Sequence, residues 1–142
     1  NIKGLLAVTR EVLPYFIRAK AGHVVHLGSV AGRWIYPKGN IYCATKAAVG
    51  ALTEAMRLDL HGSGVRVTNI APGMVETDFS LARFGDAEKA AAVYRGVDAL
   101  QPEDIAEAVS WCLARPQHVN IQEMVIYPTD QATVTMVNRK PQ

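Results

Sequence analysis

Three side chains that can take part in proton transfer lie close together in this sequence: Ser29, Tyr42 and Lys46. Twelve residues separate the serine from the tyrosine, and three separate the tyrosine from the lysine. On a helix, Tyr42 and Lys46 would share one face, about 6 Å apart along the axis. An ammonium there favours the phenolate, so the spacing predicts a lowered pKa for Tyr42. Such a phenol can exchange a proton with an alcohol or carbonyl, and Ser29 can donate a hydrogen bond to the same oxygen.

The neighbouring sequence predicts the elements that hold these residues. An apolar run at 23–27 predicts a buried strand that ends just before Ser29. Ala-rich apolar positions at three- and four-residue steps predict a helix over 40–61, and alternating β-branched residues predict a second strand over 65–71. Strand, helix and strand of these lengths imply a parallel pair, whose ligands bind beyond the carboxyl ends of the strands.

Each feature also has a simpler interpretation. A Tyr-x-x-x-Lys pair is common on solvent-facing helices, and a serine after a strand usually makes a turn or caps a helix. The combination is more specific, because the serine ends one strand while the tyrosine and lysine begin the next helix.

This spacing resembles the catalytic signature of the short-chain dehydrogenase/reductase family, Ser-x12-Tyr-x3-Lys. The likeness extends to the Asn1-Ile-Lys-Gly start and to the APGMVETDF stretch at 71–79, and so covers essentially the whole chain. Within the family, the segments 65–80, 83–86 and 101–111 look closest to NADP-dependent 3-hydroxy acid and serine dehydrogenases.

The resemblance implies an α/β fold in which residues 1–142 form the C-terminal portion of a doubly wound, Rossmann-type parallel-sheet domain. It implies an oxidoreductase that moves hydride between NADP(H) and a secondary alcohol or ketone, such as a short 3-hydroxy acid or serine. Tyr42 would be the acid/base, Lys46 would tune it and hold the nicotinamide ribose, and Ser29 would polarise the substrate oxygen. Asn1 matches the family asparagine that holds a relay water, although a capping or terminal residue is the simpler interpretation.

A second segment matches the family's Pro-Gly-x-Val-x-Thr pattern at Pro72, Gly73, Val75 and Thr77. The resemblance assigns its backbone groups to the nicotinamide amide. The Pro-Gly pair alone would also fit an ordinary turn after a strand.

Candidate substrate contacts follow from the expected carboxylate, since an arginine fork matches its two oxygens. We expect Arg83 to bind it, because the family uses the 79–97 segment as a substrate lid. Arg33, in the loop after Ser29, is the next candidate. Alternatively, Arg83 ties the lid to Asp86 or Glu88.

Further elements are expected on either side of this site. A helix over 1–20 is predicted to kink at Pro14 and to carry Leu5, Val8, Val12, Tyr15 and Phe16 near one face. The 40–61 helix has two apolar stripes, one for the sheet and one for a second layer. One or two short helices are expected over 79–97, a helix from Pro102 to before Arg115, a strand over 124–127 and an extended tail.

The composition limits other functions. A net charge of +2 without blocks of like charge gives no sign of nucleic-acid binding, and no apolar run predicts a membrane span or signal peptide. Cys43 and Cys112 have no metal-type spacing, so we expect no metal and two idle thiols in the cytoplasm. The resemblance implies a homo-oligomer, a dimer or homotetramer.

The 142 residues hold no glycine-rich turn for a pyrophosphate, so NADP comes from the resemblance and NAD stays open. For the same reason we expect the isolated piece to be inactive. Two alternatives stay open: an epimerase of the nucleotide-sugar branch, which shares Tyr-x-x-x-Lys, and a non-catalytic member that keeps the fold.

Overall fold

The structure, a computed structural model that describes residues 1–141, contains a three-stranded parallel sheet in the order β1-β2-β3. Strand β1 (Gly22–Leu27) pairs with β2 (Val65–Pro72), and β2 pairs with β3 (Glu123–Ile126). The β-branched residues of β2 suit this central position. Three of the six largest fully buried side chains belong to this strand: Val67, Thr68 and Ile70. The α/β prediction is confirmed.

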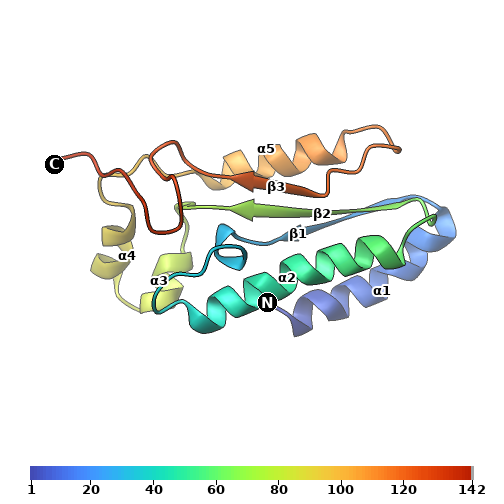
Figure 1. Cartoon of the computed structure of the whole chain (residues 1–142), viewed down its shortest axis with the longest axis horizontal. Helices are drawn as coiled ribbons and strands as arrows, with labels where there is room; N and C mark the ends of the chain where they lie inside the picture. Colours follow the sequence, from blue (N-terminus) through green and yellow to red (C-terminus); the bar gives the residue numbers. More distant parts are fainter. Residues whose placement is uncertain (142) are drawn as a thin grey trace.

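Helices cover both faces of the sheet (Figure 1). Alternation along β1 shows which helix lies on which face. His26 contacts Thr9 and Thr53 on one face, which is covered by α1 (Lys3–Ala19) and α2 (Asn40–Asp59). Val25 points the other way and packs against Ile70, Ile105 and Cys112 beneath α5 (Pro102–Leu113).

The helix α5 is held at both ends. At its start, Gln101 and Asp104 form a capping box, and Pro102 occupies the first turn. At its other end, the Arg66 guanidinium of β2 donates to the carbonyls of Leu113 (3.1 Å) and Arg115 (3.1 Å). The cationic side chain therefore satisfies carbonyls that the helix leaves without partners, and fixes α5 on the sheet.

The first helix was predicted correctly as one helix through Pro14, and the kink there stays a prediction. The predicted apolar face was partly wrong: the half-buried positions of α1 include Leu5 and Phe16. Val8 and Tyr15, which were expected on the same face, are each 66 % exposed. The buried Thr9 explains the difference, because its hydroxyl contacts His26 of β1. The face of α1 that packs on the sheet is therefore the one that carries Thr9, and Val8 lies outside it.

The prediction that one apolar stripe of α2 packs on the sheet is confirmed, whereas a second layer on the other stripe stays a prediction. Val49 is buried and Leu60, just after the helix, is buried beside it, while Leu52 and Met56 are half-buried. The second stripe faces outward, with Leu58 64 % exposed. Both cysteines are buried and free, as expected of idle thiols.

Two short helices, α3 (Phe79–Phe84) and α4 (Ala87–Tyr94), occupy the predicted lid segment. The tail was expected to be extended, but it turns back after β3. An antiparallel bridge joins Gln131 to Val137, and the Ala132 N–H donates to the Met136 carbonyl at 2.9 Å. Within residues 1–141, every helix is too short or too polar to cross a membrane.

Candidate active site

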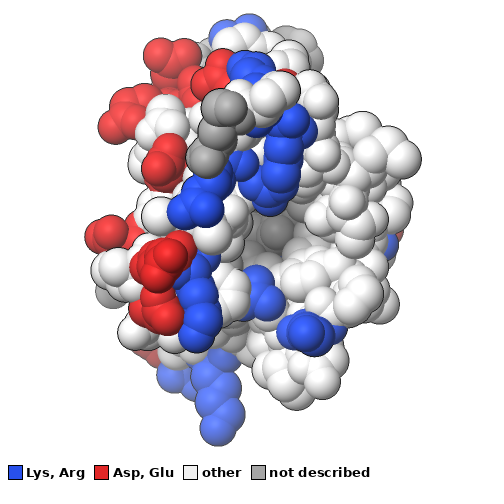
Figure 2. All heavy atoms as spheres, turned by 90° about the vertical axis from the view of Figure 1, so that its left-hand side faces the viewer, with Lys and Arg blue, Asp and Glu red and all other residues white. Residues whose placement is uncertain are grey.

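A cavity of about 690 Å³ opens at the carboxyl ends of the strands. Figure 2 looks onto this end and shows a hollow with Lys and Arg side chains near its rim. Five segments build the walls: the loop after β1, the start of α2, the loop after β2 with α3 and α4, the start of α5, and the C-terminal segment. Parallel strands place these loops together, which is why segments far apart in sequence meet here.

Ser29 and Tyr42 both line this cavity. The Ser29 backbone is extended, and its hydroxyl oxygen accepts the Ala31 N–H at 3.1 Å, so the residue also caps the short 3-10 helix Val30–Gly32. The same hydroxyl lies 3.4 Å from the Pro72 carbonyl. The predicted capping role and the predicted position at the strand end therefore occur together.

The predicted lowering of the Tyr42 pKa by Lys46 was wrong. Burial raises the pKa of Tyr42, because the phenolate is poorly solvated there, and a hydrogen bond with Ser29 and the nearby Arg83 cation act in the opposite direction. Tyr42 is therefore a neutral phenol at neutral pH, a form that can donate a proton.

Lys46 lies on the same side of α2 as Tyr42, with its Nζ 5.9 Å from the centre of the phenol ring. Its ammonium donates to the Leu27 carbonyl at 2.9 Å, and burial lowers the pKa of Lys46. The expected helical juxtaposition exists, but this bond directs the ammonium to the end of β1 and explains its weak influence on the phenol.

Asn1 is exposed and lies beside α2. Its Nδ2 donates to Thr45 Oγ1 at 3.2 Å, and that hydroxyl donates to the Tyr42 carbonyl at 2.8 Å. Ile2, rather than Asn1, is the N-cap of α1. Asn1 therefore lies next to the helix turn that carries the tyrosine and lysine, and its role with a relay water stays a prediction.

The segment after β2 is fixed on several sides. Pro72, Gly73, Val75 and Thr77 line the cavity, as does Met74 between them. The Val75 carbonyl accepts the Tyr94 hydroxyl at 2.9 Å, and the Thr77 hydroxyl accepts the Phe79 N–H at 3.2 Å. At Gly73, any Cβ would collide with Gln131 and Tyr127. A side chain at Gly73 would therefore displace Gln131 and Tyr127, so glycine allows this close approach of the C-terminal segment.

The two candidate arginines have different surroundings. Arg83 lines the cavity, and its Nη1 donates to the Tyr36 hydroxyl at 3.2 Å. It makes no ion pair with Asp86, whose partner is Lys89. Arg33 instead forms an ion pair with Glu123 of β3 and does not line this cavity.

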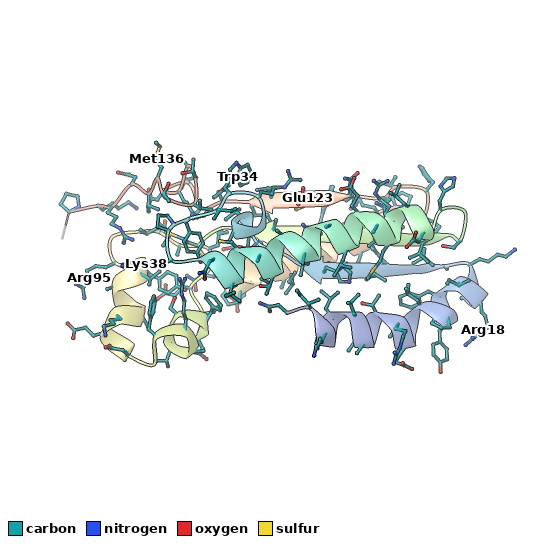
Figure 3. All side chains as sticks on the ribbon, turned by 60° about the horizontal axis from the view of Figure 1, so that its bottom comes forward. Arg18, Trp34, Lys38, Arg95, Glu123 and Met136 are labelled. Carbon is teal, nitrogen blue, oxygen red and sulfur yellow. The ribbon has the colours of Figure 1, made fainter. Side chains whose placement is uncertain are left out.

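Figure 3 labels Glu123, the partner of Arg33, away from Lys38 and Arg95, which lie toward the end of the molecule that carries α3 and α4. Arg83 is therefore the better placed of the two arginines for a ligand in the cavity. In the part of the chain that the structure describes, no group of three or more His, Cys, Asp or Glu side chains is arranged for a metal ion.

Several cavity residues were not predicted from the sequence, among them Tyr36, Tyr94, Gln131 and Arg139. Tyr36 lies in the loop between Ser29 and Tyr42, so its position between two predicted site residues could have identified it as a cavity residue. Gln131 and Arg139 come from a tail that carried no periodic pattern, and nothing local indicated that it returns to the site.

Comparisons with known proteins agree with this geometry. A family model described as short chain dehydrogenase matches residues 1–88. An NADP-dependent 3-hydroxy acid dehydrogenase of Salmonella typhi is 49% identical over 134 residues, which are 93% of this chain and 54% of the relative. Sulfoacetaldehyde reductase 2 of Chromohalobacter salexigens is also 49% identical, over 93% of this chain and 53% of the relative.

Among solved structures, the closed form of serine dehydrogenase complexed with NADP+ superposes with a TM-score of 0.93 and 46% identity, over 100% of this chain and 58% of that one. Serine dehydrogenase from Escherichia coli gives a TM-score of 0.76 at 42% identity, over 93% of this chain and 51% of that one. The chain thus spans about half the length of the curated relatives it matches.

Proposed function

The chain belongs to the short-chain dehydrogenase family, and from this premise we propose that it is the substrate-binding and proton-transfer part of an NADP-dependent oxidoreductase. The reaction would interconvert a secondary alcohol and its ketone or aldehyde, with a short 3-hydroxy acid or serine-like compound as substrate. The observation that carries the proposal is the single cavity in which Ser29, Tyr42 and Arg83 meet.

The residues present suit one end of the cofactor. Backbone groups of the Pro72–Thr77 segment and apolar side chains such as Val75 line a cavity large enough for a nicotinamide ring and a small substrate. The ammonium of Lys46 lies at the carboxyl end of β1, and we assign it to the nicotinamide ribose. NADP, when bound, supplies or accepts the hydride. The 142 residues offer no glycine-rich turn, so we assign no pyrophosphate contact to them.

Residues of this chain would transfer the proton to and from the substrate oxygen. In the reducing direction, the neutral Tyr42 phenol donates its proton to the substrate oxygen as that oxygen becomes an alcohol. Ser29 donates a hydrogen bond to the same oxygen and stabilises the developing charge. The Ser29 hydrogen bond and the Arg83 cation lower the energy of the phenolate that remains, which burial alone would disfavour.

Arg83 would hold the anionic group of the substrate. The names of the relatives are consistent with this role, because 3-hydroxy acids, serine and sulfoacetaldehyde all carry an acidic group close to the reacting carbon. The Tyr36 hydroxyl accepts one guanidinium N–H and leaves other donors of Arg83 for a ligand. A neutral substrate would gain little from this arginine.

The Tyr42→Phe variant of the full-length protein tests the assignment of proton transfer to Tyr42. Full-length here means the complete polypeptide to which these residues belong. We expect kcat to fall by about 10²–10⁴-fold, because the only group that transfers the proton is removed. NADPH affinity, measured by fluorescence titration, should change less than about twofold, since the ring and its packing remain. Tyr15→Phe, on the exposed side of α1, is the matched control. Substantial turnover by Tyr42→Phe would show that another group transfers the proton.

The substrate assignment is tested with Arg83→Gln, comparing 3-hydroxybutanoate with its uncharged amide. Loss of a charge-assisted hydrogen bond predicts a fall in kcat/KM of about 10- to 150-fold for the acid and little change for the amide. Arg33→Gln is the control, because that arginine pairs with Glu123 outside the cavity. Equal losses for both substrates would assign Arg83 to the structure of the lid segment instead.

We also propose that the full-length protein is a homo-oligomer. The outward faces of α1 and α2 expose large apolar side chains, among them Val8, Tyr15, Ile41 and Leu58. Such a surface usually marks a contact with another chain. Sedimentation of the full-length protein tests this, and a monomer at micromolar concentration would refute it. Tyr15→Phe remains a suitable control for Tyr42→Phe when its oligomeric state is unchanged, because it keeps the apolar ring.

A further inference from the structure

Gln131 is a polar residue of the C-terminal segment that is only 5% exposed and still lines the cavity. Figure 1 shows how it arrives there: the segment after β3, drawn in red, turns back beside the strand ends on its way to α4. A backbone turn fixes the residue, because the Gln131 N–H donates to the Pro128 carbonyl at 2.9 Å. A bridge to Val137 holds it on the other side.

The orientation of its side-chain amide follows from one contact. The Met74 backbone N–H lies 2.8 Å from Gln131 Oε1. Because a backbone N–H can only donate, the oxygen must be the atom that faces Met74, and the NH2 group must point the other way. The side-chain oxygen also packs against Gly73, where a Cβ would come within 2.4 Å of it.

The amide nitrogen is left with its donors unused. Within residues 1–141, Gln131 Nε2 makes no hydrogen bond, and it is not one of the fully buried unpaired atoms, so it is accessible although the residue as a whole is 5% exposed. An accessible free donor in a cavity wall can bind a ligand atom that accepts from it. The two backbone contacts of Gln131 in that wall are the Met74 N–H and the bridge to Val137, and neither of these residues carries a side-chain oxygen that could accept from Nε2.

We propose that Gln131 binds the substrate: its amide NH2 donates a hydrogen bond to an oxygen of the substrate's acidic group, while its amide oxygen holds the loop after β2 in place. This inference rests on the proposed function and deepens it, because it adds a neutral donor from the C-terminal segment to the cation of Arg83. The residue thereby links the position of the Met74 loop to the recognition of the substrate.

Gln131→Glu separates the two parts of this role. A carboxylate keeps an oxygen that can accept the Met74 N–H, but its charge is costly to bury, so at about pH 8.5 the melting temperature should fall by no more than that of Gln131→Met. It replaces the donor with a negative charge that faces the acidic group of the substrate. We expect kcat/KM for 3-hydroxybutanoate to fall by at least about tenfold, the effect of losing one hydrogen bond to a charged group. For 3-hydroxybutanamide the fall should be less than about threefold, because an amide can donate to the new carboxylate.

Gln122→Glu is the matched control, since this glutamine is exposed, lies outside the large cavity and undergoes the same change of charge. Gln131→Met adds a second comparison. It removes both the donor and the acceptor, so it should lower the melting temperature and the kcat/KM for acid and amide alike, because Met74 loses its partner. NADPH affinity of Gln131→Glu should remain within about twofold of wild type.

Equal losses for the acid and the amide with Gln131→Glu, or no loss for either, would overturn the inference. A loss explained by weaker NADPH binding would also overturn it, since the donor would then face the cofactor. Calorimetric titration with 3-hydroxybutanoate in the presence of NADP+ gives a readout that does not depend on turnover. If wild type binds the acid without oxidising it and Gln131→Glu weakens that binding tenfold, the proposed function fails and the inference stands. Absence of binding by wild type would refute the inference.

Discussion

Replacing His23 with glutamine should make the stability of the protein less sensitive to acid. His23 Nε2 lies 2.7 Å from the Thr68 hydroxyl, which itself donates to the Ile121 carbonyl. The hydroxyl can therefore only accept from the ring, so Nε2 carries the proton and Nδ1 is the bare nitrogen. Within the described residues, this buried Nδ1 has no hydrogen-bond partner. A second proton would be placed there without an acceptor.

The pKa of His23 is lowered from 6.5 to about 4, first by burial and then by the Arg66 cation. The unfolded chain therefore binds a proton as the pH falls below 6.5, while the folded protein does not bind it until about pH 4. The contribution of His23 to the free energy of unfolding is fully present above pH 6.5 and is lost as the pH falls towards 4. The difference between the pKa of His23 in the unfolded chain and in the folded protein corresponds to about 3 kcal/mol, at 1.36 kcal/mol per pKa unit. Partial exposure of the ring reduces this to about 1–2 kcal/mol, of which about 1 kcal/mol is lost by pH 5.

Urea unfolding at pH 7.5 and pH 5 measures this loss. His23→Gln keeps a side-chain donor for Thr68 and removes the titrating ring, so its loss between the two pH values should be about 1 kcal/mol smaller than that of wild type. Acidic side chains titrate in both proteins and cancel in the comparison. The variant His61→Gln, at an exposed position, is the control. If wild type and His23→Gln lose the same stability, the account of the buried imidazole is wrong.

Three further predictions concern the helix clamp and the site. Arg66→Met should lower the free energy of unfolding by about 2–3 kcal/mol, because carbonyls at the end of α5 lose a charged donor; an unchanged urea midpoint would contradict this. In the full-length protein, Lys46→Ala should weaken NADPH binding and lower kcat. Ser29→Ala should lower kcat about 10-fold or more with little effect on NADPH binding. If steady-state kinetics and fluorescence titration show the reverse pattern, the roles of the two residues are exchanged. The 142-residue chain alone should show no micromolar binding of NADPH by calorimetry, because its sequence has no glycine-rich turn for the pyrophosphate.

The sequence by itself determined the order of strands and helices and the chemical groups of the site. Hydrophobic periodicity is a local property, so the strands β1 and β2 and the helix α2 were predicted to within about two residues of their ends. The positions of Ser29 at a strand end and of Tyr42 and Lys46 on one helix face are local as well, since four residues on a helix return to the same side. The two stripes of α2 followed from the same rule.

The tertiary structure decided what these groups can do. The pKa of Tyr42 is raised by burial, which depends on segments that sequence spacing does not describe. The choice between Arg83 and Arg33 depended on the ion pair between Arg33 and Glu123, which is formed across the sheet. Gln131 reaches Met74 from 57 residues away, through a tail that has no periodic pattern. Local spacing fixes which side chains face together on one element, whereas solvation and long-range partners are fixed only when the elements pack.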